Sequence, residues 1–282
     1  MKVNVFLWPV SCCRLKVNHL PGTAGKKEAS KLMLRKLLPI VALLGIVTAA
    51  YAQDIRAIPR MWNDVPTSEL SWYKGGDTIG FSDQKLSAPT GWANRHDWRL
   101  TNPDGSPLLI GPTDYFMLEM DITSYGPAAH EAGLITIGGP PMDWADGRIM
   151  VRPSDGEVSC WGGVSPFYMF GKNMYSTGVT AHVGLLYTNE GGLNGVHYMY
   201  NGIDSGFLPF TNLEQGLFPN TQIGGYFQAL NNPNNPDNGA AIVFSNIRFN
   251  GQPISAASIP EPGSLALLGT GLAGLLGLRR RR

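Results

Sequence analysis

Short apolar segments that alternate with polar residues, separated by glycine, proline and asparagine, run through the middle of this chain. The clearest is 116–123, FMLEMDIT, in which every second side chain is apolar. Successive side chains of a β-strand point to opposite faces, so this segment predicts a strand whose four apolar side chains face a core. Between residues 53 and 253 the sequence shows no convincing helical period over ten residues. The pattern therefore excludes a helical bundle and favours an all-β body.

Several other segments have the composition of short strands. They lie at 78–81, 133–137, 148–152, 179–187, 196–200, 226–230 and 240–249. Asn189–Gly192 falls between two of them and has the composition of a hairpin turn. Turn-forming residues are abundant overall, because 35 glycines and 21 prolines occur among the 282 residues. Their combined share is about 20%, against a usual share of roughly 12%. Many short strands joined by such turns predict a β-sandwich.

Two regions of the body resemble a known class of sandwich. Residues 182–187 and 198–202 look like the central hairpin of concanavalin A-like and laminin-G-like domains, and 241–249 resembles a final strand of that class. The resemblance implies a jelly-roll-like β-sandwich of two sheets over residues 53–253. This fold hosts lectins, glucanases and structural modules, so it does not decide the function.

Residues 33–52 have the three parts of a secretory signal peptide. A short basic start precedes an apolar run, and Ala50 and Ala52 then supply small residues before Gln53. The run is too short to anchor the chain stably in a membrane, so we predict cleavage directly before Gln53. Residues 1–32 fit poorly ahead of a signal peptide. Our hypothesis is that translation starts at the methionine that follows them.

Residues 260–282 combine a proline-rich start, an apolar segment and a basic end. The sequence Pro-Glu-Pro at 260–262 cannot continue a helix. The uncharged segment 263–278 would span about 24 Å as a helix, against a hydrocarbon core of roughly 30 Å. Four arginines at 279–282 can extend this reach and hold the end of the chain on the cytoplasmic side. We predict a single transmembrane helix, joined to the body by a linker at 254–259.

This order of features resembles the PEP-CTERM sorting domain. The matching residues are Pro260, Glu261, Pro262, Arg279, Arg280, Arg281 and Arg282. The resemblance implies a Gram-negative bacterium and an exosortase, a protease of the inner membrane that processes the tail near Pro-Glu-Pro. It also implies a link to exopolysaccharide and biofilm matrix. The predicted course is export across the inner membrane, a membrane-anchored precursor, and then the cell surface or the extracellular matrix.

The charge of the body excludes one class of partner. Residues 53–258 contain ten basic and nineteen acidic side chains, a net charge of −9. Nucleic-acid binding needs a positive surface, so no nucleic-acid partner is predicted. Cys160 is the one cysteine that follows the predicted cleavage site. The body therefore cannot form an internal disulfide, and we predict that Cys160 is buried as a small apolar side chain.

The segment Glu119-Met120-Asp121 raises the alternative of glycoside hydrolysis. Laminarinase-type glucanases carry the pattern Glu-x-Asp-x-Glu or Glu-x-Asp-x-x-Glu on such a strand, and retaining glycosidases need two carboxylates about 5–5.5 Å apart. Here the next two candidate positions are Thr123 and Ser124, so the expected proton donor is missing. We therefore predict that the body is not an enzyme. A glycoside hydrolase that uses Glu119 is an alternative.

Two other sets of residues point to ligands. Segments 143–147 and 231–239 are rich in oxygen ligands, but neither has the alternating spacing of a dedicated calcium loop. We predict no cofactor and no metal site, with Ca²⁺ at these segments as the alternative. Trp92 and Trp144 stand among polar residues and turn formers, where an exposed ring can stack on a sugar.

These observations combine into one prediction for the chain. We expect an exported surface or matrix protein that an exosortase sorts, with a non-catalytic structural or adhesive body. The alternative is a carbohydrate-binding module for exopolysaccharide that uses Trp92 and Trp144.

Overall fold

The computed structural model describes residues 53–138, 145–212 and 215–254, apart from the side chains of Ala145 and Asp146. Several predicted features lie outside these residues, namely the start at Met33, the signal peptide with Ala50 and Ala52, Trp144, and the segment from 255 to 282. Within the described ranges, no helix has the length and apolar character needed to cross a membrane.

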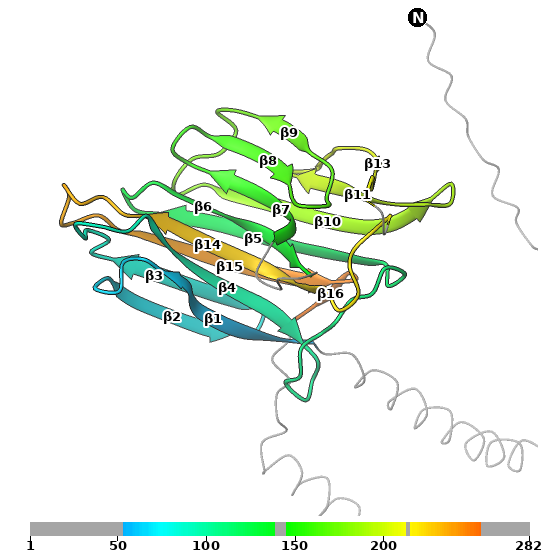
Figure 1. Ribbon diagram of the computed structural model, residues 1–282, viewed down its shortest axis with the longest axis horizontal. Coiled ribbons are helices and arrows are strands. Elements are labelled where there is room, and N and C mark those ends of the chain that lie inside the picture. The colour runs from blue at the N-terminus through cyan, green and yellow to red at the C-terminus, as the bar shows by residue number, and fades with distance from the viewer. Residues whose placement is uncertain (1–52, 139–144, 213–214, 255–282) are drawn as a thin grey trace, which may run out of the picture. The chain divides into compact units, whose positions relative to one another are not determined.

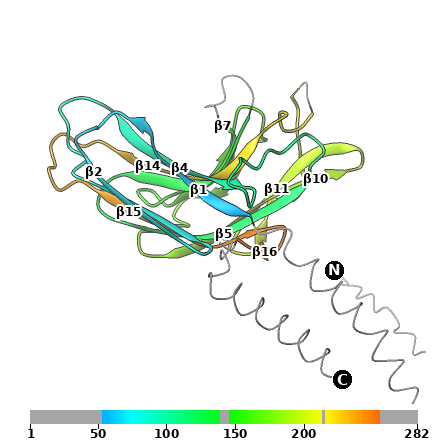
Figure 2. The same cartoon turned by 90° about the horizontal axis from the view of Figure 1, so that it is seen from below.

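The described body is an all-β sandwich of two antiparallel sheets, as predicted (Figures 1 and 2). The seven-stranded sheet, here called sheet A, has the order β1 (Asp54–Asn63), β4 (Ala93–Thr101), β14 (Gln222–Leu230), β6 (His130–Ile137), β7 (Ala145–Arg152), β8 (Glu157–Trp161) and β9 (Tyr168–Gly171). The nine-stranded sheet, sheet B, has the order β12 (Ile203–Asp204), β11 (Leu193–Tyr200), β10 (Thr180–Glu190), β5 (Phe116–Tyr125), β15 (Ala240–Phe249), β3 (Thr78–Gln84) and β2 (Glu69–Gly75). Two short strands complete it, since β13 (Leu208–Pro209) pairs with β11 and β16 (Gln252–Pro253) pairs with β15.

Strand β5 shows how the alternating pattern builds the core. Its buried and half-buried positions alternate from residue 116 to 124, and the four predicted apolar side chains join the core between the sheets. The predicted segments at 78–81, 133–137, 148–152, 179–187, 196–200, 226–230 and 240–249 also coincide with strands. Cys160 lies fully buried in the same core, as predicted, and burial raises the pKa of its thiol.

Strand β4 escaped prediction, although all nine of its residues are buried. It lies between β1 and β14, two strands far from each other in the sequence (Figure 1). Trp98 and Leu100 belong to the core between the sheets. Because side chains alternate along a strand, Arg95, Asp97 and Arg99 lie on the opposite, outer face of sheet A.

A buried polar network ties the chain near Trp62 to β3 and β4. Oδ2 of the fully buried Asp83 accepts a hydrogen bond from Asn94 at 2.8 Å and lies 2.9 Å from Nε2 of His96. Nδ1 of His96 accepts from the backbone N–H of Arg60 at 3.0 Å, so Nε2 carries the proton. Burial alone would raise the pKa of Asp83, but its hydrogen bonds, that with His96 first, outweigh burial and lower this pKa. The network joins β3 of sheet B to β4 of sheet A on the face of β4 opposite to Arg95.

Candidate functional site

The outer face of sheet A carries a buried row of charge on β4. Nε and Nη2 of Arg95 donate to the two carboxylate oxygens of Asp97 at 2.8 and 2.9 Å. Nη2 of Arg99 donates to the same carboxylate at 2.7 Å. The three side chains are at most 3% exposed. Asp97 is therefore the shared partner that allows both guanidinium groups to stay buried.

Rings and guanidinium groups alternate across this face. The guanidinium of Arg95 lies 5.0 Å from the ring centre of Trp62 and 5.4 Å from that of Tyr226. The guanidinium of Arg148 lies 5.1 Å from the ring centre of Tyr226 and 5.3 Å from that of Trp161. We call these five residues the cation–π ladder. They come from β1, β4, β14, β7 and β8, so attraction between cations and ring faces links five strands of sheet A.

Glu131, on β6, lies beside the cation–π ladder. Its Oε1 accepts from Nη1 of Arg148 at 3.4 Å and from the hydroxyl of Tyr226 at 3.3 Å. Burial raises the pKa of Glu131, and the nearby guanidinium of Arg148 opposes this only in part. Burial also raises the pKa of Tyr226, which keeps its phenol protonated. Glu131 is thus a carboxyl group that has lost much of its water.

A cavity of about 170 Å³ opens next to Glu131. Its walls come from the segment before β4, the start of β6, the turn after β7 and the end of β14. The lining residues are Trp92, Ala129, His130, Glu131, Arg152, Ser154, Gln228 and Leu230. Pockets that enclose a drug-sized ligand measure roughly 300–1,000 Å³. This cavity therefore suits one part of a longer molecule that continues along the face.

His130 contributes to the wall of this cavity, but its ring faces the core between the sheets, where its centre lies 6.0 Å from that of Phe227. The side chain is 3% exposed, and its Nδ1 lies 2.6 Å from the carbonyl oxygen of Ala128. A carbonyl can only accept, so Nδ1 carries the proton. Burial lowers the pKa of His130, and the hydrogen bond to Ala128 opposes this only in part. The ring is therefore neutral, and among the described residues its buried Nε2 lone pair has no partner.

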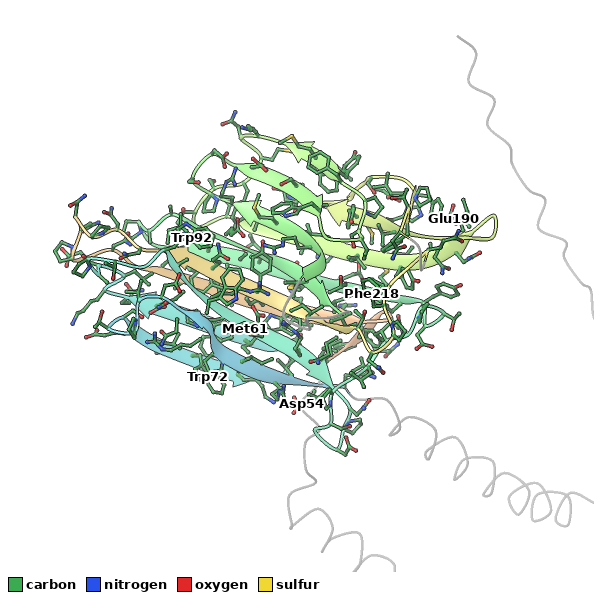
Figure 3. All side chains as sticks on the ribbon, viewed as in Figure 1. Asp54, Met61, Trp72, Trp92, Glu190 and Phe218 are labelled. Carbon is green, nitrogen blue, oxygen red and sulfur yellow. The ribbon has the colours of Figure 1, made fainter. Side chains whose placement is uncertain are left out.

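Trp92 stands at the rim of the cavity with 58% of its surface exposed. Its ring centre lies 6.3 Å from that of Trp62, at an interplanar angle of 39°. Asn231 fixes the segment before Trp92, because its side-chain amide donates to the carbonyls of Ala88 and Gly91 at 2.9 and 3.0 Å. Figure 3 shows Trp92 beside the end of β14 and Trp72 on β2, in the other sheet. The ring predicted to stack on a sugar thus lies against the cavity.

Arg152, the one arginine among the lining residues, is paired with two acids. Nε and Nη2 of Arg152 donate to the carboxylate of Asp155 at 2.9 and 2.8 Å. Nη2 also donates to Glu157 at 2.5 Å. Arg95, Arg99, Arg148 and Arg152 are all paired, and their partners are Asp97, Glu131, Asp155 and Glu157. These four positive and four negative side chains balance.

Glu119 lies on the other sheet, on the outer face of β5. Asp121 accepts from Nδ1 of His182 at 2.8 Å, and Nε2 of this histidine lies 3.5 Å from Glu119. Asn246 donates to the second oxygen of Asp121 at 2.5 Å. The His182 side chain is 43% exposed. The residues of the hydrolase alternative therefore share a strand face, but they do not line the cavity that Trp92 borders.

The calcium alternative rested on two oxygen-rich segments. In the loop 231–239, side-chain oxygens of Asn231, Asn232 and Asn235 accept from nearby backbone N–H groups. These amides are thus engaged in shaping the loop. Within the ranges that the structure covers, no three or more His, Cys, Asp or Glu side chains form a group that could hold a metal ion. Calcium at these segments stays an untested alternative.

Residues 258–282 match the family model for the PEP-CTERM protein-sorting motif. The chain carries a PEP-CTERM sorting signal. The motif implies an exported protein that is held transiently in a membrane and processed by an exosortase. The roles of its individual prolines, glutamate and arginines stay predictions, because these residues lie outside the described structure.

Among curated proteins, none matches this PEP-CTERM chain. Solved structures do. An alginate lyase from Corynebacterium sp. is 10% identical, with a TM-score of 0.45, over 70% of this chain and 93% of its own. The alginate lyase AlgAT5, from polysaccharide lyase family 7, is 13% identical, with a TM-score of 0.39, over 61% and 77%. The carbohydrate recognition domain of Emp47p is 13% identical, with a TM-score of 0.41, over 71% and 89%.

These matches overturn one sequence-based prediction. We predicted that the body is not an enzyme, and alginate lyases are among the structures to which it is similar. That prediction rested on the absence of recognised catalytic patterns, and a sandwich supports many other chemistries. At these identities the similarity describes the fold and assigns no activity.

Most of the site was missed in the sequence, although a signal was present. Arg95, Asp97 and Arg99 occur at every second position, which is the spacing of three side chains on one face of a strand. Opposite charges at that spacing can neutralise each other inside a sheet. Read as a strand, this segment would have marked the centre of the outer face of sheet A.

Proposed function

We propose that this PEP-CTERM protein is exported across the inner membrane of a Gram-negative bacterium and held there by the helix 264–278. An exosortase then processes it near Pro260-Glu261-Pro262 and releases it to the cell surface or the extracellular matrix. The motif match at 258–282 supports this course. The two prolines also favour an extended backbone, which a protease can seat along its active site.

Truncation before Pro260 tests the sorting step. The truncated protein should escape the membrane-anchored stage, and replacing Glu261 by alanine in the full chain should leave unprocessed precursor in the membrane. A matched control, Ser255→Ala, changes the linker ahead of the signal and should be processed normally. The proposal fails if truncation alters neither the location of the protein nor its mass in the envelope.

We propose further that the body binds polysaccharide at the cavity beside Trp92. One observation carries this proposal: an exposed indole borders a cavity that is also lined by Gln228, whose side-chain amide makes no hydrogen bond within the described residues. Sugar rings present an apolar face of C–H groups and a rim of hydroxyls. An aromatic ring beside polar groups matches both, because the ring packs against the C–H face while the polar groups bind hydroxyls.

Binding to the exopolysaccharide of a host strain tests this assignment. The Trp92→Ala variant should lose at least about tenfold in affinity, which corresponds to about 1.4 kcal/mol. Trp72→Ala is the matched control, because Trp72 is 49% exposed and lies on β2 of sheet B. Equal affinity of the Trp92 and Trp72 variants would refute the placement of the site. Retention of the wild-type melting temperature would show that both variants are folded.

A further inference from the structure

The cavity beside Trp92 has a chemistry more specific than carbohydrate in general. The one arginine that lines the cavity is already paired with protein carboxylates. This residue, Arg152, gives two hydrogen bonds to Asp155 and one to Glu157. A sugar carboxylate would have to compete with these two acids for the guanidinium. The cavity therefore offers an acidic sugar no free positive charge among its lining residues.

The wall also presents an acceptor. Oε1 of Glu131 is bonded to Arg148 and Tyr226, and among the described residues no hydrogen bond engages Oε2. A ligand carboxylate has only acceptor oxygens, so it would meet the carboxylate of Glu131 acceptor to acceptor. A hydroxyl can donate to this carboxylate.

Gln228 supplies a complementary group. It lies on β14, is 5% exposed and lines the cavity. Within the described part of the chain, its side-chain amide makes no hydrogen bond. The amide offers one acceptor oxygen and two donor protons. Because a sugar hydroxyl both donates and accepts, neighbouring hydroxyls of one ring can satisfy the amide and the carboxyl group together.

The charge of the whole body acts in the same direction. Residues 53–258 carry a net charge of −9, and the paired side chains on the outer face of sheet A balance, so they do not offset it. A polyanion would approach against a repulsive field, whereas a neutral polymer would feel none.

From these contacts we infer that the cavity takes an uncharged, hydroxyl-rich sugar residue, so that the polysaccharide bound is a neutral one and not a polyuronate. One hydroxyl donates to Oε2 of Glu131, the amide of Gln228 bonds a further hydroxyl, and Trp92 covers the apolar face of the ring. This inference rests on the proposed carbohydrate-binding function and names the class of its ligand.

The first test compares two soluble probes of similar length, a neutral glucan and polygalacturonate, by titration calorimetry at 50 and 500 mM NaCl. The glucan should bind at least tenfold more tightly, with the same affinity at both salt concentrations, because no ion pair forms. Tighter binding of polygalacturonate, weakening with salt, would overturn the inference and leave the proposed function standing. If neither polymer binds wild-type protein, the proposed function fails and the inference falls with it.

Variants then assign the contacts. Gln228→Leu, which keeps the size of the side chain, should weaken glucan binding about three- to tenfold, the effect of one or two lost hydrogen bonds. The double variant Asp155→Asn with Glu157→Gln frees Arg152 and should raise affinity for polygalacturonate. Asp204→Asn, on β12 of sheet B, is the control and should alter neither polymer. If Trp92→Ala abolishes glucan binding while Gln228→Leu binds as wild type, the polar groups of the cavity do not bind the sugar hydroxyls and the inference is wrong.

Discussion

The two sheets of this sandwich hold charge on their outer faces in opposite ways. On sheet A, Arg95, Asp97 and Arg99 are buried and share partners, and Arg95 lies between aromatic rings of the cation–π ladder. On sheet B, the pairs around His182 and His197 are open to solvent on at least one side. Buried pairs must be matched closely, whereas exposed pairs contribute little. Similar charge patterns on strands can therefore form either a buried, closely paired cluster or a hydrated surface.

The sharpest way to break this comparison is to remove one acid from each face. Asp97→Asn should cost about 3–5 kcal/mol in free energy of unfolding, because it leaves two buried guanidinium groups without their carboxylate. Asp121→Asn on sheet B should cost about 1 kcal/mol or less, because its partners His182 and Asn246 are reached by water. Urea denaturation of both variants measures the contrast. Equal losses would show that the two faces hold charge alike.

Glycines on the two sheets should also differ. A Cβ atom at Gly225, on β14, would overlap the indole of the fully buried Trp98, so Gly225→Ala should destabilise the fold by about 1–3 kcal/mol. A Cβ atom at Gly184, on β10, would meet the flexible end of Met199 at 3.0 Å, which can move aside. Gly184→Ala should therefore be close to neutral. Thermal unfolding of the two variants measures this difference. A destabilised Gly184→Ala variant would show that the outer face of sheet B does not tolerate an added Cβ atom.

The histidines should give opposite dependences on pH. Burial alone would lower the pKa of His197, but hydrogen bonds to Glu190 and Asp204 outweigh burial and raise it. The stabilisation by these pairs is full below pH 6.5 and is lost as pH rises through the raised pKa. His197→Gln should thus lower the free energy of unfolding at pH 6 and not at pH 9, by under about 1 kcal/mol in urea denaturation. The pKa of His130 is lowered, so folding loses stability as pH falls below 6.5. A His197 effect that grows with pH would contradict this assignment.

The smallest effect belongs to Glu119. If the binding site lies on sheet A, Glu119→Gln should change affinity for the neutral glucan by less than about twofold, since Glu119 lines no part of the cavity. Calorimetry under the conditions used for Gln228→Leu gives a direct comparison. A large loss of glucan affinity would move the site to sheet B and revive the hydrolase alternative.

Strands β5 and β4 show how far the sequence could predict the fold. Every second residue of β5 is apolar, because one face meets the core and the other meets water, so simple alternation identified it. Both faces of β4 are buried, and its outer face is filled by Arg95, Asp97 and Arg99. Hydropathy alone predicts a polar loop for such a segment. Its neighbours in the sheet, β1 and β14, come from distant parts of the chain, and only the folded sheet supplies the partners that neutralise it.

The candidate site could be approached from the sequence only at Trp92. Turn formers and polar residues around it pointed to an exposed ring, and the ring is exposed, while its role in binding stays a prediction. Its location beside His130, Glu131 and Gln228 depends on the order of strands in sheet A, which nothing local in the sequence specifies. The non-enzymatic prediction failed for a simpler reason, since it rested on the absence of recognised catalytic patterns.

The enclosed thiol of Cys160 has a consequence for how such a protein is made. It is the single cysteine of the described body, and its sulfur is sealed among apolar side chains. A body of this kind needs no oxidoreductase to form or rearrange a disulfide, and reducing agents leave its fold intact. The same fold should therefore persist in compartments of very different redox potential, so the timing of its maturation is not tied to thiol chemistry.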